Sequence, residues 1–385
     1  MTPLQNSYIE VDTAAITHNA KAITSAYPHR YNIAVIKGNA YGHGYGIVPA
    51  LINGGINAFA VSKLSEALAV REYDKANPVI MLQPITPDLY KTASENNISV
   101  CINDSETLDE AILSGCSLKI HIKVDSGMNR LGFKEKAELD NAYKKALDCK
   151  RLSIEGIFTH FHTSGRIDKE YKKNKETFES LTKDIDLKSI PIVHTNRTQT
   201  AVLHKTPDYE TGARFGIALF GFLTVYGYSK GIKGKIRKLQ FETQRRFKGI
   251  EPCLLPVNEP LRKALNVYTK VLQVKAVKKG EYVGYGLMHR AKSNEYIAVI
   301  DIGYGDGIGR RRIHTPVSIN GKLYEIIGDV GMGMCEVLAD ETVKRGDTVC
   351  IFGGNIPSTK ITGALCTTIY EAMTNFDSSI PRKYI

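Results

Sequence analysis

The sequence predicts an α/β protein with an N-terminal eight-stranded (β/α)8 TIM barrel and a C-terminal β-rich domain. Up to residue 222, short β-branched and apolar runs alternate with longer amphipathic stretches, as in strands joined by crossover helices. Eight such runs occur, and eight parallel strands can close into a barrel. From about residue 264 the helical periodicity fades and short strands dominate. An open, doubly wound sheet is the alternative for the first part.

The predicted barrel strands are short apolar runs separated by segments long enough for helices. One such segment is 62–76, whose apolar residues fall largely on one face. A short strand is also expected at 8–12, where Asp12 and Thr13 offer an N-cap to the helix that follows. The eight barrel strands are NIAVIK (32–37), AFAV (58–61), PVIML (78–82), SVCI (99–102), LKIHIKV (118–124), SIEGIFTHF (153–161), PIVHT (191–195) and IALFGF (217–222).

The C-terminal part reads as short strands and tight turns. Between TPVSI and KLYEIIG stands the pair Asn320-Gly321, a strong signal for a type I′ hairpin because both central positions prefer positive φ. We place the barrel at 12–224, a basic insertion or linker at 225–262, and the β domain at 263–385 together with 1–11.

The composition limits the class of protein. A chain of 385 residues with 43% hydrophobic and 24% charged residues exceeds one ordinary core and is not generally disordered. Seven scattered cysteines without a C-x-x-C pair argue against a disulfide scaffold and a zinc ribbon, so we expect no metal site. The N-terminus shows no signal-peptide pattern, and no apolar run is long enough to cross a bilayer. We therefore expect a cytoplasmic protein.

The net charge of +11 is concentrated in one segment. Residues 225–251 hold eight Lys or Arg residues and two Glu residues. Such a segment can bind an anionic partner such as RNA or a membrane surface, and a solvated surface insertion has the same composition. We adopt the second interpretation and expect neither a nucleic-acid nor a membrane partner.

The segment AVIKGNAYGHG (34–44) is the first pointer to chemistry. In it, Lys37 ends a strand and precedes a glycine-rich loop. A lysine at the C-terminal mouth of a barrel strand lies where such folds place their active sites. Burial there would lower its pKa and make the amine a nucleophile toward a carbonyl carbon. Taken alone, the pattern also fits a lysine whose stem lies along a strand end.

Further segments follow in a fixed order: KVDSGMNRLGF (123–133), ARFGIALFG (213–221) and EYVGYG (281–286). With 34–44, they resemble the alanine racemase family, the fold-type III enzymes that use pyridoxal phosphate. Weaker support comes from AVIDIGYGDGIGRR (298–311) and TTIYEA (367–372). The resemblance spans nearly the whole chain except the insertion. It implies pyridoxal 5′-phosphate as cofactor, a small amino acid as substrate, and a head-to-tail homodimer with shared active sites.

The resemblance assigns two catalytic bases. Lys37 matches the lysine that holds the cofactor as a Schiff base and acts on one face of the substrate. Tyr285, in the VGYG stretch, matches the base on the opposite face, which the partner subunit contributes. A racemase needs both groups, because one removes the α proton and the other returns a proton from the other side. The structural alternative for Tyr285 is a tyrosine packed in a glycine-flanked turn.

The resemblance also assigns the cofactor site. Arg214 matches an arginine that donates to the pyridine nitrogen. Because a guanidinium stays protonated, that nitrogen remains an acceptor, which limits the ring as an electron sink and disfavours transamination. His160 matches a histidine that contacts this arginine, although a buried core histidine fits the pattern equally. The implied phosphate donors are two backbone amides and two hydroxyls, those of Gly216, Ile217, Tyr41 and Tyr370.

On the substrate side, Arg130 matches an arginine beside the substrate carboxylate. Lys123 matches the position where many family members carry a carbamylated lysine that orients this arginine. Tyr304 lies in GYGDGIG (303–309), which lacks the strand and helix context of a dinucleotide fingerprint. We interpret that segment as a turn, with Tyr304 at the substrate entrance as in the family.

Two departures from the family pattern stand out. The usual Asn-Ser after the seventh-strand histidine is absent from the run 194–198, so Thr198 or Arg197 would serve the phosphate instead. Where the family reads Met-Asp near the substrate, this chain has Met332 followed by Gly333. The loss of that aspartate removes a fixed charge and side-chain volume, which would widen or neutralise the substrate pocket.

We therefore predict an isomerase, a pyridoxal-phosphate-dependent amino-acid racemase that interconverts L- and D-alanine by a two-base mechanism and supplies D-alanine for the cell wall. The alternatives are a related racemase with a broader or different substrate, such as serine or lysine, and a degenerate non-catalytic relative that binds the cofactor. A decarboxylase of the same fold type would need an acidic partner for the ring nitrogen instead of Arg214. A cofactor-homeostasis protein of this fold would lack the C-terminal β domain.

Overall fold

The computed structural model describes residues 5–163, 168–222, 239, 243 and 261–385. The predicted insertion at 225–262 lies almost entirely outside the described residues. The chain divides into two compact units. One, here called the barrel unit, comprises Ala15–Lys37 and Val48–Arg262; the other, the β unit, comprises Met1–Ala14, Gly38–Ile47 and Lys263–Ile385. The domain boundaries at 224 and 263 stay a prediction.

The barrel unit contains a parallel eight-stranded sheet in the order β8-β7-β6-β5-β4-β3-β2-β9. Its ends meet, because Arg197 and Arg214 form a bridge and the Thr211 amide donates to Val193 O at 3.0 Å. The predicted (β/α)8 barrel is thus confirmed. The strands are β2 (Tyr31–Val35), β3 (Ala58–Val61), β4 (Val79–Met81), β5 (Ile98–Ile102), β6 (Leu118–Val124), β7 (Leu152–Thr159), β8 (Ile192–His194) and β9 (Gly212–Phe215).

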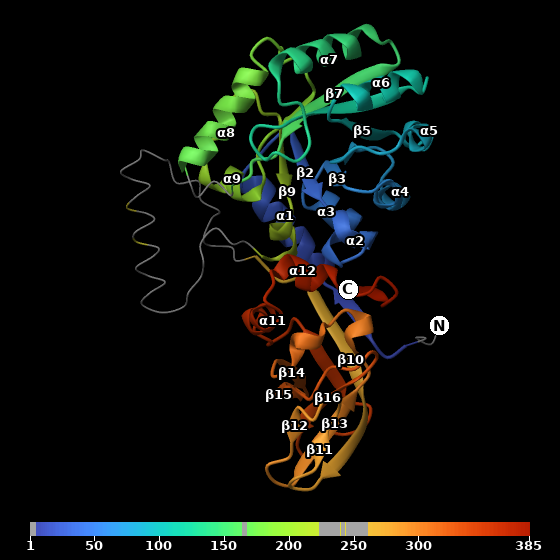
Figure 1. The fold of residues 1–385 in the computed structure, drawn as a ribbon, viewed down its shortest axis with the longest axis vertical. Coiled ribbons are helices and arrows are strands. Elements are labelled where there is room, and N and C mark those ends of the chain that lie inside the picture. The colour runs from blue at the N-terminus through green and yellow to red at the C-terminus, as the bar shows by residue number, and fades with distance from the viewer. Residues whose placement is uncertain (1–4, 164–167, 223–238, 240–242, 244–260) are drawn as a thin grey trace. The chain divides into compact units, whose positions relative to one another are not determined.

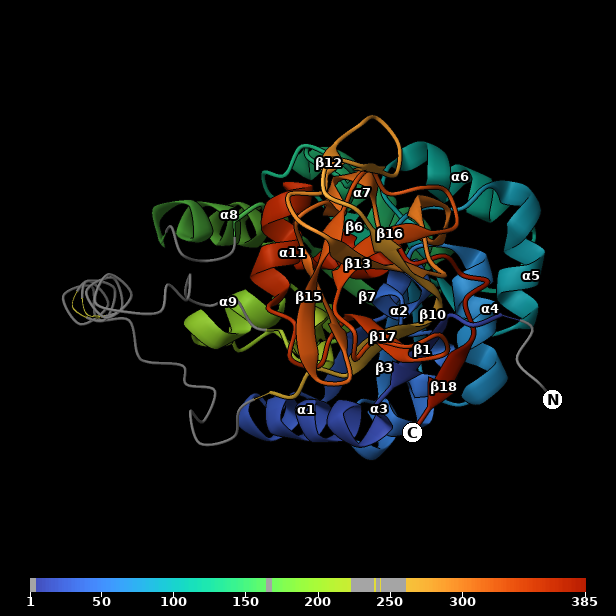
Figure 2. The same ribbon diagram turned by 90° about the horizontal axis from the view of Figure 1, so that it is seen from below.

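Helices connect these strands and lie around their outside (Figures 1 and 2). Local capping explains individual starts: the Asp104 carboxylate accepts the Thr107 amide at 2.8 Å and so begins α6. The helices are α1 (Thr13–Ala26), α3 (Val48–Asn53), α4 (Leu64–Tyr73), α5 (Tyr90–Glu95), α6 (Ser105–Leu113), α7 (Lys136–Asp148), α8 (Asp168–Leu181) and α9 (Thr198–Leu203). Among the described residues, none of the helices combines the length and hydropathy that a membrane crossing requires.

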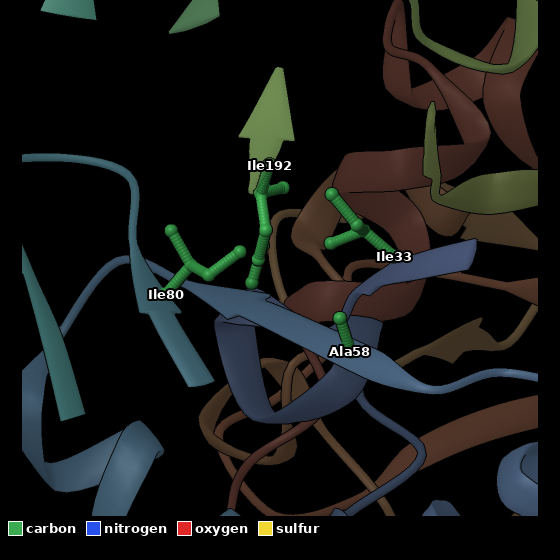
Figure 3. Packing of buried hydrophobic residues seen from close by; sticks show 5 residues of the cluster. Ile33, Ala58, Ile80 and Ile192 are labelled. Atoms are coloured by element: carbon green, nitrogen blue, oxygen red, sulfur yellow. The ribbon is translucent and has the colours of Figure 1, made fainter. Parts of the chain in front are cut away.

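The barrel core is made by aliphatic side chains from strands that face one another. Ile33, Ile80 and Ile192, from β2, β4 and β8, point toward a shared interior, and Ala58 of β3 lies beside them (Figure 3). Every residue of β3 and of β5 is buried, because helices cover one face of the strands and the core covers the other. Burial of each isoleucine contributes about 1.5–3 kcal/mol.

The predicted eighth strand is wrong. IALFGF forms the 3₁₀ helix η3 (Ile217–Phe220), and the eighth strand is the preceding β9. All four residues of η3 are buried, and a short apolar run that is buried on every side does not distinguish a strand from a helical turn. Gly216, at φ −123° and ψ −110°, separates the two elements, and Gly221 ends η3 at φ 91°.

The β unit is built on a largely antiparallel sheet in the order β13-β16-β15-β14-β17-β10-β1-β18. Because β10 also pairs with β13, the strands from β13 to β10 close on themselves, which confirms the predicted β-rich domain. The strands are β1 (Tyr8–Val11), β10 (Leu265–Val277), β13 (Glu295–Ile300), β14 (Pro316–Ile319), β15 (Lys322–Ile327), β16 (Cys335–Ala339), β17 (Thr348–Phe352) and β18 (Arg382–Tyr384).

Smaller elements complete the β unit. Asn320 and Gly321 join β14 to β15 with φ of 50° and 82°, as the predicted type I′ turn requires. A separate hairpin pairs β11 with β12. The bounds of these elements are β11 (Tyr282–Val283), β12 (His289–Arg290), α11 (Ser358–Leu365) and α12 (Ile369–Thr374).

Candidate active site

Lys37 lies two residues after the end of β2, and the Ile36 amide between them donates to Ala60 O at 3.0 Å, so hydrogen bonds to β3 hold the backbone up to the lysine. Although Lys37 is exposed, the protein around its amine and the positive charge of Arg130 lower its pKa, against the opposing effect of Glu66. A larger fraction of the amine is therefore unprotonated near neutral pH than for a fully solvated lysine. That is the form a nucleophile or a base requires.

The segment after Lys37 is not an ordinary loop but a left-handed turn, α2 (Lys37–Tyr41). Gly38, Asn39, Ala40 and Tyr41 all take positive φ, from 51° to 64°. For residues other than glycine this conformation costs roughly 1–2 kcal/mol each. Such strain concentrates at functional sites, where the surrounding structure holds it in place.

Within the β unit, this turn packs against α12. Gly42 has φ 85°, and a Cβ there would lie 2.3 Å from Met373 O, so only glycine fits. The Tyr41 and Tyr370 ring centroids are 6.0 Å apart. The two phenols that the resemblance assigned to the phosphate are therefore neighbours.

Arg214 lies on β9, beside β2, and is 3% exposed. Its Nη1 donates to His194 Nδ1 at 2.7 Å and to His194 O, and its Nη2 donates to Thr159 O at 2.7 Å and Thr195 O at 3.0 Å. A guanidinium has five N–H groups, so the Nε–H is the one without an acceptor among the described residues. Burial lowers the pKa of Arg214 to about 10, which leaves it protonated at neutral pH.

The histidine bonded to Arg214 is His194, at the end of β8, and no hydrogen bond joins His160 to Arg214 in the described part of the chain. Burial, followed by the charge of Arg214 and of other nearby cations, lowers the pKa of His160 to about 2. His160 is therefore a neutral neighbour of the arginine. Sequence reasoning missed the role of His194, although a histidine ending a barrel strand in PIVHT was a usable signal.

The residues expected at the phosphate also meet. The Gly216 amide donates to Thr198 Oγ1 at 3.2 Å, and Ile217 follows directly as the first residue of η3. Thr198 itself is the first residue of α9 and is buried. A hydroxyl and closely spaced backbone amides suit phosphate oxygens.

Sequence reasoning missed Glu210, which fixes the loop before α9. Its buried carboxylate accepts the amides of Thr195 and Asn196 at 2.8 and 2.6 Å, and Asn196 Nδ2 at 2.6 Å. Burial raises the pKa of Glu210 to about 7, although these bonds and Arg214 oppose the shift. The carbonyl of Thr195, which accepts from Arg214, and the start of α9 are thereby held in place.

Lys123 lies one residue before the end of β6 and is 5% exposed, and its amine donates to Leu82 O at 3.0 Å. Within the described chain, no carboxylate lies within 4.0 Å of this amine. Burial lowers its pKa, opposed by Cys101 and assisted by the charge of Arg130. A buried lysine without an anionic partner favours a neutral or modified state.

The loop that carries Arg130 is pinned by Asp125. One carboxylate oxygen accepts the amides of Gly127 and Asn129 at 2.9 and 3.0 Å, and the other accepts the Arg130 amide at 3.0 Å. The Arg130 side chain is exposed and lines an open hollow beside this loop. The charge of Arg130 lowers the pKa of both Lys37 and Lys123, so these cations occupy one neighbourhood.

The β unit gathers the remaining predicted residues. Tyr285 is 75% exposed, forms a bridge with Asp329, and stands near Gly331, whose Cβ position lies 4.0 Å from the tyrosine ring. Tyr304 begins the 3₁₀ turn η4 (Tyr304–Asp306), which agrees with the turn predicted there. Its amide donates to Gly331 O at 2.9 Å. The β unit also exposes four apolar side chains that lie close in sequence to Tyr285 or to Gly331, namely Leu287, Met288, Met332 and Met334.

Comparison with known proteins gives a consistent result. Models of the alanine racemase N-terminal and C-terminal domains match residues 11–224 and 264–384. The chain is 32% identical over 389 residues to the alanine racemase of Listeria innocua, covering 98% of each. It superposes on the alanine racemase from Bacillus anthracis with bound L-Ala-P at a TM-score of 0.85, with 31% identity over 100% of this chain and 96% of that one. The histidine racemase from Leuconostoc mesenteroides gives a TM-score of 0.83 at 26% identity, covering 100% and 99%.

Proposed function

The chain belongs to the alanine racemase family, and we propose that it interconverts L- and D-alanine with pyridoxal 5′-phosphate as its cofactor. The observation that carries this proposal is Arg214, a buried cation with four of its five N–H groups committed to protein acceptors. The remaining Nε–H suits a ring nitrogen that lacks its own proton. A decarboxylase would need a carboxylate at this position.

The described residues fit the cofactor. Lys37 would hold it covalently through an amine whose pKa is lowered. Thr198 and the adjoining amides of Gly216 and Ile217 would bind the phosphate, together with the Tyr41 and Tyr370 hydroxyls. When bound, the cofactor would withdraw electrons from the substrate Cα and make its proton acidic.

The chain's own residues would then move the proton. Lys37 would take the α proton on one face and Tyr285 would return one on the other, and the roles reverse for the other enantiomer. Because Tyr285 is 75% exposed, we propose that a second copy of the chain covers it in a homodimer with shared sites. Arg130 would bind the substrate carboxylate, as a planar bidentate donor suits that group.

Lys123 is the proposed site of carbamylation. Its neutral amine would add to carbon dioxide, forming an N–C bond and releasing one proton. The anion that results would lie near Arg130, whose charge already acts on Lys123. The modification would replace a buried amine that lacks an ion pair with an anion that can pair with the neighbouring arginine. Mass spectrometry after trapping of the carbamate would detect the modification.

A chiral assay tests the proposed function. Purified protein with added pyridoxal phosphate is incubated with L-alanine in D₂O, and the D-alanine formed and the deuterium at Cα are measured. We expect both to appear, and to vanish in Lys37→Ala. The matched control Lys91→Ala changes an exposed lysine of α5 and should leave both rates unchanged. Absence of deuterium at Cα for every amino acid tried would refute a racemase.

A second candidate is a racemase that accepts larger amino acids. Gly333 replaces the family aspartate, and a Cβ there would meet nothing within 4 Å. Met332 and Met334, on either side of Gly333, are exposed and apolar, so the position of the family aspartate carries neither a charge nor side-chain volume. Comparison of kcat/KM for alanine, serine, lysine and histidine distinguishes the candidates, and a strong preference for alanine favours the first.

A further inference from the structure

A chain of hydrogen-bonded side chains runs from Arg214 into the interior of the barrel. His194 Nε2 lies 3.1 Å from His121 Nδ1, and His121 Nε2 lies 3.2 Å from Glu155 Oε2. At its far end, Glu155 also accepts the Ser99 hydroxyl and pairs with Lys119 at 3.3 Å. The two imidazoles are buried completely. A guanidinium is thus connected to a carboxylate through two histidines from β8 and β6.

The donor and acceptor roles along this chain are fixed by its ends. Arginine has only donors, so His194 Nδ1 must accept, and a neutral His194 must carry its proton on Nε2. That proton points at His121 Nδ1, which must accept in turn, so His121 carries its proton on Nε2 and donates it to Glu155. An imidazolium at His121 would leave two donors facing each other. One arrangement of protons therefore satisfies every contact.

The local backbone positions these hydrogen-bonded side chains. A β-bulge in the pairing of β6 with β7 falls between Ile120 and His121, and it inserts Glu155 as an extra residue on β7. Bulges re-aim side chains, and here the carboxylate reaches His121. Only glycine fits at the next position, Gly156, because a Cβ there would lie 2.2 Å from the His121 ring.

Charge and burial agree with this arrangement. Burial lowers the pKa of His194 well below its ordinary value, with the charge of Arg214 acting in the same direction, so the ring is neutral. Burial alone would raise the pKa of Glu155, but the hydrogen bonds from His121 and Ser99 and the charge of Lys119 lower that pKa below its ordinary value. The carboxylate is therefore charged and can accept.

We infer that Glu155 and His121 are positioning residues for the cofactor site: they fix the proton of His194 on Nε2 and thereby the direction of the Arg214 Nε–H. If His121 loses its acceptor, it can carry its proton on Nδ1 and donate to His194. His194 would then place its own proton on Nδ1, facing Arg214 Nη1 at 2.7 Å. Two donors repel at that distance, so the guanidinium would turn. The role rests on the proposed function, but the proton arrangement does not.

The test compares two substitutions of one residue in the full-length protein. Glu155→Gln keeps an oxygen acceptor for His121 and removes the charge, whereas Glu155→Leu removes the acceptor. Imidazole ¹⁵N spectra of histidine-labelled protein, recorded without and with pyridoxal phosphate, report which nitrogen of His194 carries the proton. We expect the wild type and Glu155→Gln to show Nε2–H alone and Glu155→Leu to show a second, Nδ1–H form. The dissociation constant for the cofactor should rise about tenfold in Glu155→Leu, the effect of losing one charged hydrogen bond.

Other outcomes overturn the inference. A wild-type His194 protonated on Nδ1 contradicts it, and so does a folded Glu155→Leu protein with unchanged His194 signals. If Glu155→Leu does not fold, His121→Phe is used instead, because it removes the acceptor for the His194 proton. An unchanged Nε2–H signal of His194 in that variant would also refute the inference. Failure of the proposed function would appear separately, as a missing racemase reaction in a protein that keeps the wild-type proton arrangement.

Discussion

Two of the proposed site residues, one in each unit, differ sharply in their exposure to solvent. In the barrel unit Arg214 is 3% exposed and four of its N–H groups have protein acceptors. In the β unit Tyr285 is 75% exposed, between glycines at φ 70° and 69°. A buried cation can be positioned by one chain, because folding alone supplies its acceptors. An exposed phenol acquires a desolvated environment only when another surface covers it.

Because of this difference in exposure, we expect substitutions in the two units to affect different properties of the protein. Changes in the barrel unit should alter stability and cofactor binding together, since the same contacts serve both. Changes around Tyr285 should alter proton transfer and leave folding intact, since the exposed side chain contributes little to the core. Experiments that measure both properties on each unit can therefore confirm or break the contrast.

The largest effect is expected for Tyr285→Phe. Loss of the phenolic proton donor should lower kcat by roughly 10²–10⁴, the contribution typical of a general acid–base group, in at least one direction. The cofactor absorbance and the unfolding midpoint should not change. Tyr282→Phe is the matched control, since Tyr282 is 51% exposed in the same unit. Full activity of Tyr285→Phe in both directions would contradict the two-base scheme.

A large effect on stability is expected for Arg214→Met. The substitution leaves three carbonyls and one imidazole nitrogen without a donor, and a buried polar group left unsatisfied costs about 1–3 kcal/mol. Urea unfolding should show this decrease, and cofactor titration should show weak binding. Arg151→Met changes an exposed arginine of the same unit and should alter stability by less than about 0.5 kcal/mol. Equal losses in the two variants would show that the contacts of Arg214 are not specific.

The pH dependence of stability sharpens the comparison inside the barrel unit. The pKa values of His160 and His194 are lowered in the folded state, so the unfolded chain binds more protons below pH 6.5 and acid destabilises the fold. Glu210 contributes to the pH dependence of stability with the opposite sign. Its pKa is raised to about 7, so the folded state binds more protons between pH 4.5 and 7, and acid stabilises it there.

Glu210→Gln separates these terms because glutamine does not titrate. Between pH 6.5 and 4.5 the variant should lose unfolding free energy more steeply than the wild type, by about 1.4 kcal/mol per pH unit. Denaturant titrations at several pH values in this range measure the two slopes. Parallel slopes would mean that Glu210 is already ionised in this range and that its three hydrogen bonds outweigh its burial.

Particular residues show which features of the fold and of the site could be predicted from the sequence and which could not. Seven barrel strands and the Asn320-Gly321 hairpin follow from periodicity and turn chemistry, because these signals are local. The left-handed turn was not predictable, since Ala40 and Tyr41 have no intrinsic preference for φ near 50°. The hydrogen-bonded series from Arg214 to Glu155 was also missed, because contact between His121 and Glu155 depends on a bulge and on pairing between strands. A glycine inside a strand, Gly156, was the available signal.

The smallest effect concerns specificity and the exposed face beside Tyr285. Gly333→Asp restores the charge and volume that the family pattern has at this position, and a Cβ there meets nothing within 4 Å, so the fold should tolerate it. If the open surface admits larger substrates, the aspartate should raise the ratio of kcat/KM for alanine over that for histidine by roughly tenfold, the range typical of a small steric change in a pocket. Gly363→Asp is the matched control, since its Cβ position is equally open and it lies on α11. An unchanged ratio in Gly333→Asp would show that this face of the β unit does not contact the substrate side chain, and would leave proton transfer by Tyr285 as the proposed role of this face.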